Sequence, residues 1–337
     1  MASLVKEIGS FLTENGLSHS VKNDSGCEVI VIDKPQLAIF PIEVTAVTAE
    51  EAFVKSEEAW EKIKEYTDVH GYPVIITEDR WRSDTGALRN RLLAHMRQHV
   101  QVYARNCEVR RIEKKEAAAF LAEHHSYGNA SCRYHYGMFL KRHTGHNADG
   151  GVGWPEPGTL VAVAQFSNAR KWLKGDKEIR SYEWTRYASL SGVRISGGMG
   201  RMLKTFIEDV KPDDIMSYAD LEWSWGDAYS QLGFSLEGQK EPVTFVVDEQ
   251  WRRSPVKPGM TAKAENVIAG VTGEKENVID GVTGEKENVI AGVTEENENV
   301  IAGVTGEKEN VIAGVTGNLF FRNFGSNKYR LKLTDYE

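Results

Sequence analysis

Apolar residues recur at helical spacing in several stretches of the chain. Leu4, Ile8, Phe11 and Leu12 fall on one side of a helix, which we predict at residues 3–16. The same period predicts further helices at residues 49–66, 85–97, 114–125 and 202–210. Runs of β-branched and aromatic residues predict strands at residues 27–32, 37–40, 72–76, 108–112, 134–140, 159–166, 181–189, 214–220 and 243–247.

The order of these elements predicts an α/β (α+β) fold with two domains. Residues 1–103 hold a helix, a hairpin, a helix, a strand and a helix in that order. Residues 107–262 are predicted to form a mixed sheet flanked by helices, with residues 134–140 and 159–166 paired antiparallel. Two strand-like segments in residues 318–337 are predicted to close this second domain as a hairpin.

Residues 263–317 interrupt the pattern. From residue 265, the eleven-residue unit ENVIAGVTGEK recurs about five times with few changes. Each unit contains glycine and β-branched residues that oppose a helix, so a mobile acidic loop and a small strand meander are both open. We interpret the tandem repeat as an insertion within the second domain that takes no part in catalysis.

The repeat also changes the meaning of the net charge. Residues 265–317 contain eleven acids and three lysines, a net of −8, which equals the net charge of the whole chain and leaves the remainder neutral. In that remainder, basic residues gather between Arg80 and Lys115, a pattern that suits the phosphates of a nucleic acid. Acids interrupt this run, so a solvated charged face is the alternative.

Composition also limits the class of protein. Three widely spaced cysteines favour neither a disulfide framework nor a cysteine-rich zinc site. No apolar run approaches the ~18 residues that cross a membrane, and no secretory leader is visible. We therefore expect a protein of the reducing cytoplasm, with no membrane partner. The histidines have no ligand spacing, so we expect no metal.

A glycine-rich turn lies between a predicted strand and a predicted helix. Arg194, Gly197, Gly198 and Gly200 form this turn, in which free backbone N–H groups at a helix start suit a pyrophosphate. Together with the later Tyr-x-x-Leu-Gly-Phe, the turn resembles that of the GNAT acetyltransferase superfamily. The resemblance implies that the turn binds acyl-CoA or a similar acyl donor, and that Tyr229 acts as general acid.

A narrower resemblance covers more than fifty residues. The series Glu183, Arg186, Gly197-Gly198, Ser217-Tyr-Ala-Asp220 and Tyr229 is similar to Mom-type DNA adenine modification proteins of phages, and to the C-terminal half of phage Vsr-like homing endonuclease proteins. It implies that DNA is the partner and that Glu183 orients or deprotonates the amine. Arg186 and Ser217 would position the substrate, with Asp220 as an alternative base.

Three further residues are candidates for substrate binding. The same resemblance places a histidine before a glycine, at His125, although a histidine that only caps its helix is the alternative. Trp223 and Trp225 flank the expected crevice and are candidates for stacking on a base, with packing in the core as the alternative.

The first 103 residues resemble the Vsr-like branch of the PD-(D/E)XK nucleases. That chemistry requires strand carboxylates that hold a divalent metal. Val29 and Phe40 occupy the positions of the family's Asp and Glu, and neither can bind a metal. We therefore expect a degenerate nuclease fold that has lost cleavage.

The leading hypothesis is a phage-type DNA modification enzyme that transfers a small acyl-like group to a base amine, adenine by analogy, on a base flipped out of the duplex or met in a single strand. A second hypothesis is a homing-endonuclease relative that binds or cleaves DNA through residues 1–103. A third is a non-enzymatic phage protein that binds a host defence or DNA-processing factor, with the acidic repeat mimicking the charge of DNA.

Overall fold

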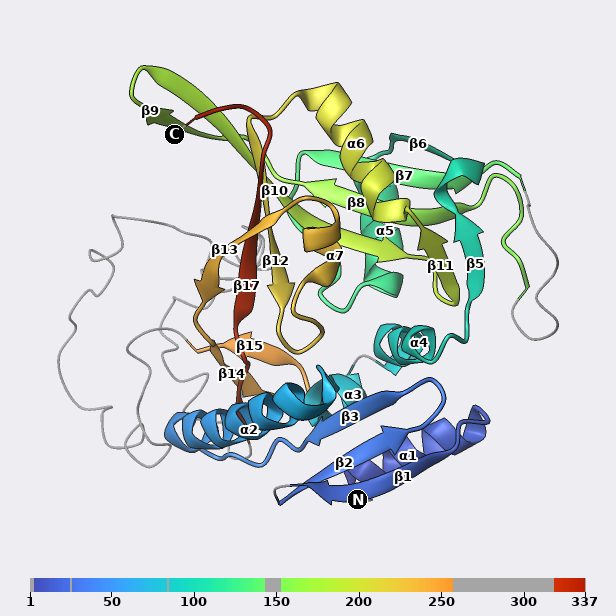
Figure 1. The fold of residues 1–337 in the computed structure, drawn as a ribbon, viewed down its shortest axis with the longest axis vertical. Helices are drawn as coiled ribbons and strands as arrows, with labels where there is room; N and C mark the ends of the chain where they lie inside the picture. Colours follow the sequence, from blue (N-terminus) through green and yellow to red (C-terminus); the bar gives the residue numbers. More distant parts are fainter. Residues whose placement is uncertain (1–2, 25, 84, 143–152, 257–317, 337) are drawn as a thin grey trace, which may run out of the picture.

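A four-stranded sheet organises the N-terminal part of the chain. The computed structural model describes residues 3–24, 26–83, 85–142, 153–256 and 318–336 (Figure 1). The first three strands form an antiparallel meander, and β4 runs parallel to β3 because the long helix α2 provides the crossover. The bounds are α1 Leu4–Glu14, β1 His19–Asp24, β2 Cys27–Ile32, β3 Leu37–Ile42, α2 Ala49–His70 and β4 Val74–Thr77.

An eight-stranded mixed sheet organises the rest of the described chain. Its order is β13-β17-β12-β10-β8-β7-β6, and β9 pairs with the start of β10. Neighbours are antiparallel except for β10 and β12, which are parallel. The bounds are β6 Cys107–Arg111, β7 Tyr134–Leu140, β8 Leu160–Phe166, β9 Arg170–Lys174, β10 Lys177–Ser189, β12 Asp214–Asp220, β13 Ser235–Lys240 and β17 Ser326–Lys332.

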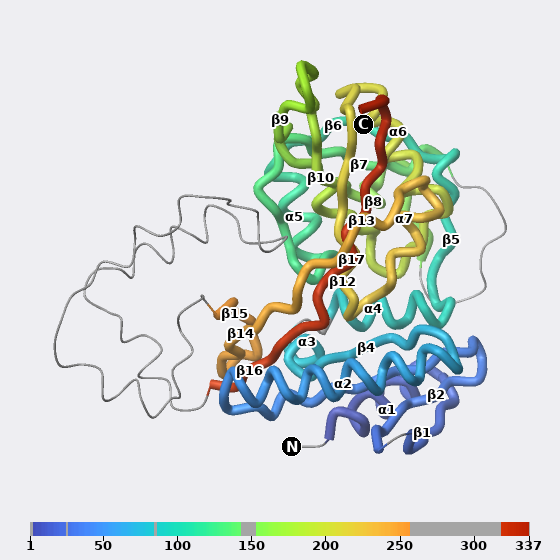
Figure 2. The backbone as a smooth tube through the Cα atoms, turned by 60° about the vertical axis from the view of Figure 1, so that its left-hand side comes forward, coloured from blue at the N-terminus to red at the C-terminus, as the bar shows by residue number. Residues whose placement is uncertain are grey.

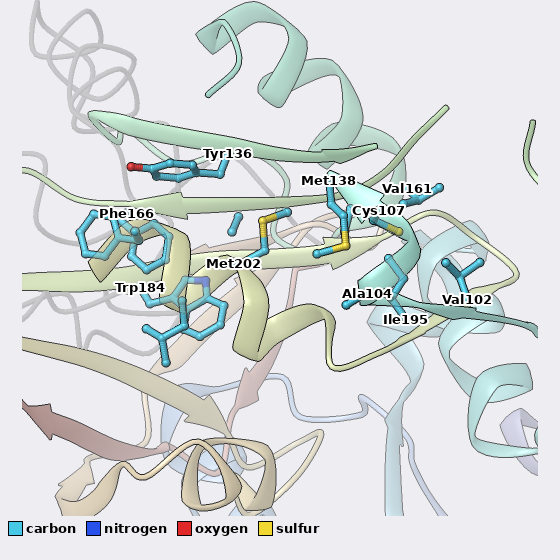
Figure 3. Packing of buried hydrophobic residues seen from close by; sticks show 14 of the residues in the cluster. Val102, Ala104, Cys107, Tyr136, Met138, Val161, Phe166, Trp184, Ile195 and Met202 are labelled. Carbon is cyan, nitrogen blue, oxygen red and sulfur yellow. The ribbon is translucent and has the colours of Figure 1, made fainter. Parts of the chain in front are cut away.

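Two helices cover opposite faces of this sheet. On one face lies α6 (Gly198–Val210), whose Phe206 ring stacks on that of Phe166 with 3.8 Å between the ring centroids. Phe166 in turn stacks on Trp184, and Met202 lies beside them (Figure 3). The other face packs against the apolar side of α5 (Lys114–His124). Burial of these large side chains is the main stabilisation of the C-terminal part.

Short elements connect the two parts. The helices α3 and α4 follow β4, and β5 then pairs in parallel with β11, directly before α6. A three-stranded sheet with the order β15-β14-β16 packs against α2 through β14 and β16 (Figure 2). The remaining bounds are α3 Glu78–Ser83, α4 Thr85–His95, β5 Val100–Tyr103, η1 Ala104–Asn106, β11 Val193–Ser196, α7 Asp227–Gln231, β14 Thr244–Val247, β15 Arg253–Pro255 and β16 Leu319–Arg322.

An apolar cluster joins the N-terminal sheet to the C-terminal part. Phe40 and Ile75 of the N-terminal sheet are buried together with Leu221, Phe321 and Phe324. Trp60 of α2 stacks on Phe324, with 5.2 Å between their ring centroids. The two parts therefore share buried surface rather than meeting through a flexible linker.

A chain of buried charges crosses the same boundary. Arg253 donates hydrogen bonds to Asp79 and, at 2.7 Å, to Glu222. Arg80 donates to the other oxygen of Glu222, also at 2.7 Å, and pairs with Asp220 at 3.5 Å. We call Asp79, Arg80, Asp220, Glu222 and Arg253 the charge chain. Its signs alternate along the series of contacts, so each buried charge has at least one opposite neighbour.

Most of the predicted elements are confirmed, including the antiparallel pairing of β7 with β8. The C-terminal hairpin is a correction: β16 pairs with β14, whereas β17 lies between β12 and β13 in the larger sheet. The chain changes sheets at Gly325, whose φ of 80° suits glycine, while Phe321 and Phe324 turn towards the N-terminal part. Residues 263–317 lie outside the described residues; the flanking strands β15 and β16 both pair with β14.

Replacement of Asp79 by Asn tests the charge chain. Burial alone would raise the pKa of Asp79, but the Arg253 guanidinium outweighs it and lowers that pKa below the ordinary 3.8. A lowered carboxyl pKa stabilises the fold at neutral pH, and this stabilisation is lost as the pH falls through the folded-state value. We expect Asp79→Asn to lower the free energy of unfolding by about 3–5 kcal/mol at pH 7.

Urea unfolding followed at steps from pH 7 to pH 3 measures this difference. The gap between wild type and Asp79→Asn should narrow below about pH 4, because the wild-type carboxyl then becomes neutral as well. Asp176→Asn, at an exposed turn, is the matched control and should follow the wild type throughout. A gap that does not change with pH would show that the charge of Asp79 is not what stabilises the fold.

Candidate functional site

The candidate site lies where β10 and β12 part. The two strands are paired only from Ser181↔Asp214 to Glu183↔Met216. Beyond this point β10 pairs with β8 and β12 pairs with β17, so no backbone ladder joins them. The Ser217 hydroxyl donates a hydrogen bond of 2.8 Å to the Trp184 carbonyl and is the last link between the strands. We call this place the strand fork.

A β-bulge sets the side chains of β10 at the fork. Trp184 pairs with Phe166 and Arg186 pairs with the adjacent Gln165, so Thr185 is an extra residue. Directly paired residues lie on the same face of a sheet. Trp184 therefore faces α6 together with Phe166, whereas Arg186, which pairs with Gln165, faces α5. Glu183 precedes Trp184 and therefore lies on the same face as Arg186. Without the bulge, the carboxylate and the guanidinium would fall on opposite faces.

Tyr229 reaches the fork from α7. This short helix begins after Gly226, whose φ of 99° and close approach to the Tyr329 ring leave no room for a side chain. The Tyr229 oxygen lies 2.8 Å from Ser217 Oγ. The Trp184 carbonyl can only accept, so Ser217 gives its single hydrogen to that carbonyl and accepts from the Tyr229 hydroxyl. Tyr229 is half-buried, not sealed inside the core.

Burial raises the pKa of two groups at the fork. It raises the pKa of Tyr229, so the phenol is protonated at neutral pH, although Ser217 and Arg91 act in the opposite direction. It also raises the pKa of Glu183, against the pull of Lys240 and Arg186. A carboxyl with a raised pKa and a protonated phenol form a base and an acid pair that suits proton transfer.

Arg186 is buried at 3 % exposure and is held by backbone carbonyls. Its Nε donates to Gly128 O at 3.2 Å, and its Nη1 donates to Thr185 O at 2.9 Å. Burial lowers its pKa, but Tyr127 and Glu183 support the charged form. Arg186 is thus fixed on the same face of β10 as Glu183.

His125 and Asp220 lie next to this group but differ in availability. Burial and the nearby Arg186 lower the pKa of His125 to about 3, so the imidazole is neutral and its Nδ1 accepts from Tyr127 N. Asp220 accepts a hydrogen bond from the Tyr127 hydroxyl and pairs with Arg80. The carboxylate of Asp220 therefore belongs to the charge chain, which leaves Glu183 as the better placed base.

The glycine turn forms the start of α6. Gly197 has a φ of 74°, and a Cβ on Gly198 would lie 2.5 Å from the Tyr187 hydroxyl. The first bond of the helix runs from Arg201 N to Gly197 O, so the amides of Gly198, Met199 and Gly200 precede it. Arg194 is exposed beside this turn. Gly198 is therefore required by packing against Tyr187, and the free amides at the helix start suit an anionic group on electrostatic grounds.

The two tryptophans predicted to flank the crevice join the two parts of the protein instead. Trp223 is buried at 6 % exposure among residues of α1, α3 and α4, and the Arg91 guanidinium lies 4.1 Å from its ring centre. Trp225 is half-buried between Trp60 and Tyr72. Each ring packs against the N-terminal part, which agrees with the packing alternative rather than with stacking on a base.

Sequence reasoning missed two side chains of α4. Arg91 and His95 are exposed, yet burial by the surrounding protein lowers the pKa of Arg91 to about 10 and of His95 to about 4. Arg91 also lowers the pKa of Tyr229, so its guanidinium lies near the phenol at the fork. Only the basic run after Arg80 hinted at Arg91.

The N-terminal sheet provides no metal ligands at the nuclease positions. Val29 and Phe40 are buried in the apolar cluster that joins the two parts. Within the described ranges, no three His, Cys, Asp or Glu side chains gather as a metal site would require. Among the helices that the structure describes, none is long and apolar enough to cross a membrane.

Comparison with known proteins adds no relative. No protein-family model matches the sequence, and no curated protein is significantly similar to it.

Replacement of Ser217 by Ala tests the link across the fork. The change leaves the buried Trp184 carbonyl without its donor and the Tyr229 hydroxyl without its acceptor. We expect the free energy of unfolding to fall by about 1–3 kcal/mol. Ser230→Ala, on the exposed side of α7, is the matched control and should stay within about 0.5 kcal/mol of the wild type. Equal stability of the two variants in urea would contradict this role of Ser217.

Proposed function

We propose that the protein transfers a small acyl-like group from a phosphate-bearing donor to an amine of a nucleobase in DNA. One observation carries the proposal: Glu183, Arg186, Ser217 and Tyr229 converge at the strand fork, beside a helix that begins with a glycine turn. A base and an acid at the fork, with an anion-binding turn at the start of the helix that covers the other face of the sheet, are the parts that group transfer needs.

The arrangement of elements supports a GNAT-like C-terminal part. After β10 come the short strand β11, the glycine turn, α6 and then β12, which is parallel to β10 at first and then separates from it. The fold order of the N-terminal part is consistent with the nuclease resemblance, since α1 precedes a meander, a crossover helix and a parallel strand. We do not extend the proposal to cleavage, because Val29 and Phe40 stand where carboxylates are needed.

Residues of the glycine turn would hold the donor. Gly197, Gly198 and Gly200 with Arg194 suit a pyrophosphate, because the first amides of α6 are free of helix bonds and Arg194 supplies a positive charge. A bound acyl thioester would supply the activated acyl carbon. This requirement fits acyl-CoA or a similar donor.

The side chains of the fork would carry out the two proton transfers. Glu183 accepts the proton that the base amine loses as its nitrogen bonds to the acyl carbon. Tyr229 gives its proton to the leaving sulfur as the old bond breaks, and Ser217 fixes the phenol in position. Arg186 fixes the carboxylate and the substrate. The amine must come from a flipped base or a single strand, because a stacked base keeps its amine inside the duplex.

Mass spectrometry of nucleosides tests the proposal directly. DNA from cells that express the protein should contain an adenosine-type nucleoside of increased mass. Tyr229→Phe should reduce it by about a hundredfold or more, because the acid is lost while the ring remains. Tyr66→Phe, in α2, is the matched control and should leave the yield unchanged. An unmodified nucleoside profile with the wild-type protein would overturn the proposed function.

The pH dependence of transfer tests the role of Glu183. A base acts in its deprotonated form, and burial raises the pKa of Glu183 above the ordinary 4.5. The rate should therefore fall as the pH decreases through a value above 4.5, measured as modified nucleoside formed per minute on an oligonucleotide. Glu183→Gln should lower the rate by about 10²–10⁴ and abolish this acidic limb. An acidic limb that persists in the variant would assign it to another group.

A further inference from the structure

A cavity lies between the first helix and the helices that follow β4. Leu4, Ile8 and Leu12 of α1 are buried in one apolar cluster with Trp81 of α3 and Leu88 of α4. These helices therefore pack on the same face of the N-terminal sheet. They leave a cavity of about 300 Å³ between them, a volume at the lower end of the range that small-molecule sites occupy.

Arg89 of α4 lines this cavity and lies over two aromatic rings. Its guanidinium carbon is 4.8 Å from the centre of the Trp81 ring and 5.7 Å from the centre of the Phe11 ring. The two rings meet edge to face, with 5.6 Å between their centres. Contacts of this kind restrain the long side chain, so the guanidinium has a defined place in the cavity wall.

The guanidinium of Arg89 has no hydrogen-bond acceptor in the protein. Its Nε is shielded from solvent without a partner, and among the residues that the structure describes none accepts a hydrogen bond from Arg89 or forms an ion pair with it. A charged group that loses water normally gains acceptors in exchange. Arg82 in α3 shows this ordinary case, with Glu7 at 3.2 Å and Glu78 at 2.9 Å. Arg89 therefore keeps donors for a ligand.

The charges around the cavity favour an anion. Two carboxylates line it, but Glu7 is already engaged by Arg82. Glu14 is exposed and stands about two helical turns after Lys6, which also lines the cavity. Lys6 and Arg89 thus outnumber the single carboxylate that is left.

We propose that this cavity binds a small organic anion, whose carboxylate or phosphate pairs with Arg89 while its apolar body lies against the half-buried Phe11 ring. The planar guanidinium presents its N–H groups in a fork that matches both oxyanions. The site belongs to the N-terminal part alone, so it does not depend on the proposed group transfer at the fork.

Binding of simple aromatic anions to the full-length protein tests this assignment. The probes are benzoate and phenyl phosphate, followed by ligand-observed NMR titration, with benzylamine as the probe that keeps the ring and reverses the charge. We expect a dissociation constant of about 1 mM or below for at least one anion, and at least about tenfold weaker binding of benzylamine. The anion that binds more tightly identifies the oxyanion. Arg89→Gln should weaken its binding about tenfold.

Arg110→Gln is the matched control. Arg110 also lies over an aromatic ring, 4.0 Å from the centre of Phe139, but it is exposed on β6 in the larger sheet. This variant should bind the anions like the wild type. The assignment would be overturned by wild-type affinity in a folded Arg89→Gln variant, or by the absence of binding of both anions up to about 10 mM.

A second variant leaves Arg89 in place and covers the case in which Arg89→Gln does not fold. Ser10 is exposed on α1 and lines the cavity, so Ser10→Trp should obstruct it and weaken anion binding about tenfold or more. Thr13→Trp adds the same ring at an exposed position of the same helix and should leave the affinity unchanged. Equal affinity of the two folded tryptophan variants would place the anion elsewhere and end the proposal.

Discussion

The charge chain is the interaction on which the rest of the structure depends. Asp79 and Arg80 come from the helix after β4, whereas Asp220, Glu222 and Arg253 come from the C-terminal part. Removing these charges from water is costly, and the cost is offset only while every member keeps its opposite neighbours. The two parts are thereby restricted to one relative placement. Because Asp220 ends β12, this placement also fixes one wall of the strand fork.

The charge chain also explains why the two acids at the fork, Asp220 and Glu183, have different surroundings. Asp220 is held by Arg80 and Tyr127 and orders the structure, whereas Glu183 has a raised pKa and a half-buried side chain. The bulge at Thr185 then brings Arg186 to the same face as Glu183. The N-terminal part thus supports the C-terminal part as its scaffold.

The sequence predicted the local elements better than the contacts between them. Helices with a clear apolar side, such as α1 and α6, and buried strands such as β8 have periodic patterns that depend only on neighbouring residues. The edge strand β1 was missed, because its mostly exposed His-Ser-Val-Lys-Asn-Asp sequence has no such pattern.

The site was predictable to a similar degree. Resemblance indicated Glu183, Arg186, Ser217 and Tyr229, which the structure brings together. It could not place Trp223 and Trp225, since a tryptophan at an interface and one at a crevice look alike in sequence. Arg80 and Arg91 could not be singled out from the basic run, because their partners lie more than a hundred residues away along the chain.

The position of β17 has a consequence for biosynthesis. This strand lies between β12 and β13, and its Tyr329 ring stacks on that of Tyr229. During translation, residues 326–332 emerge from the ribosome about a hundred residues after Tyr229, with the repeat in between. Until then β12 has an open edge, so the nascent chain passes through an interval in which another strand, or a chaperone, can occupy that edge.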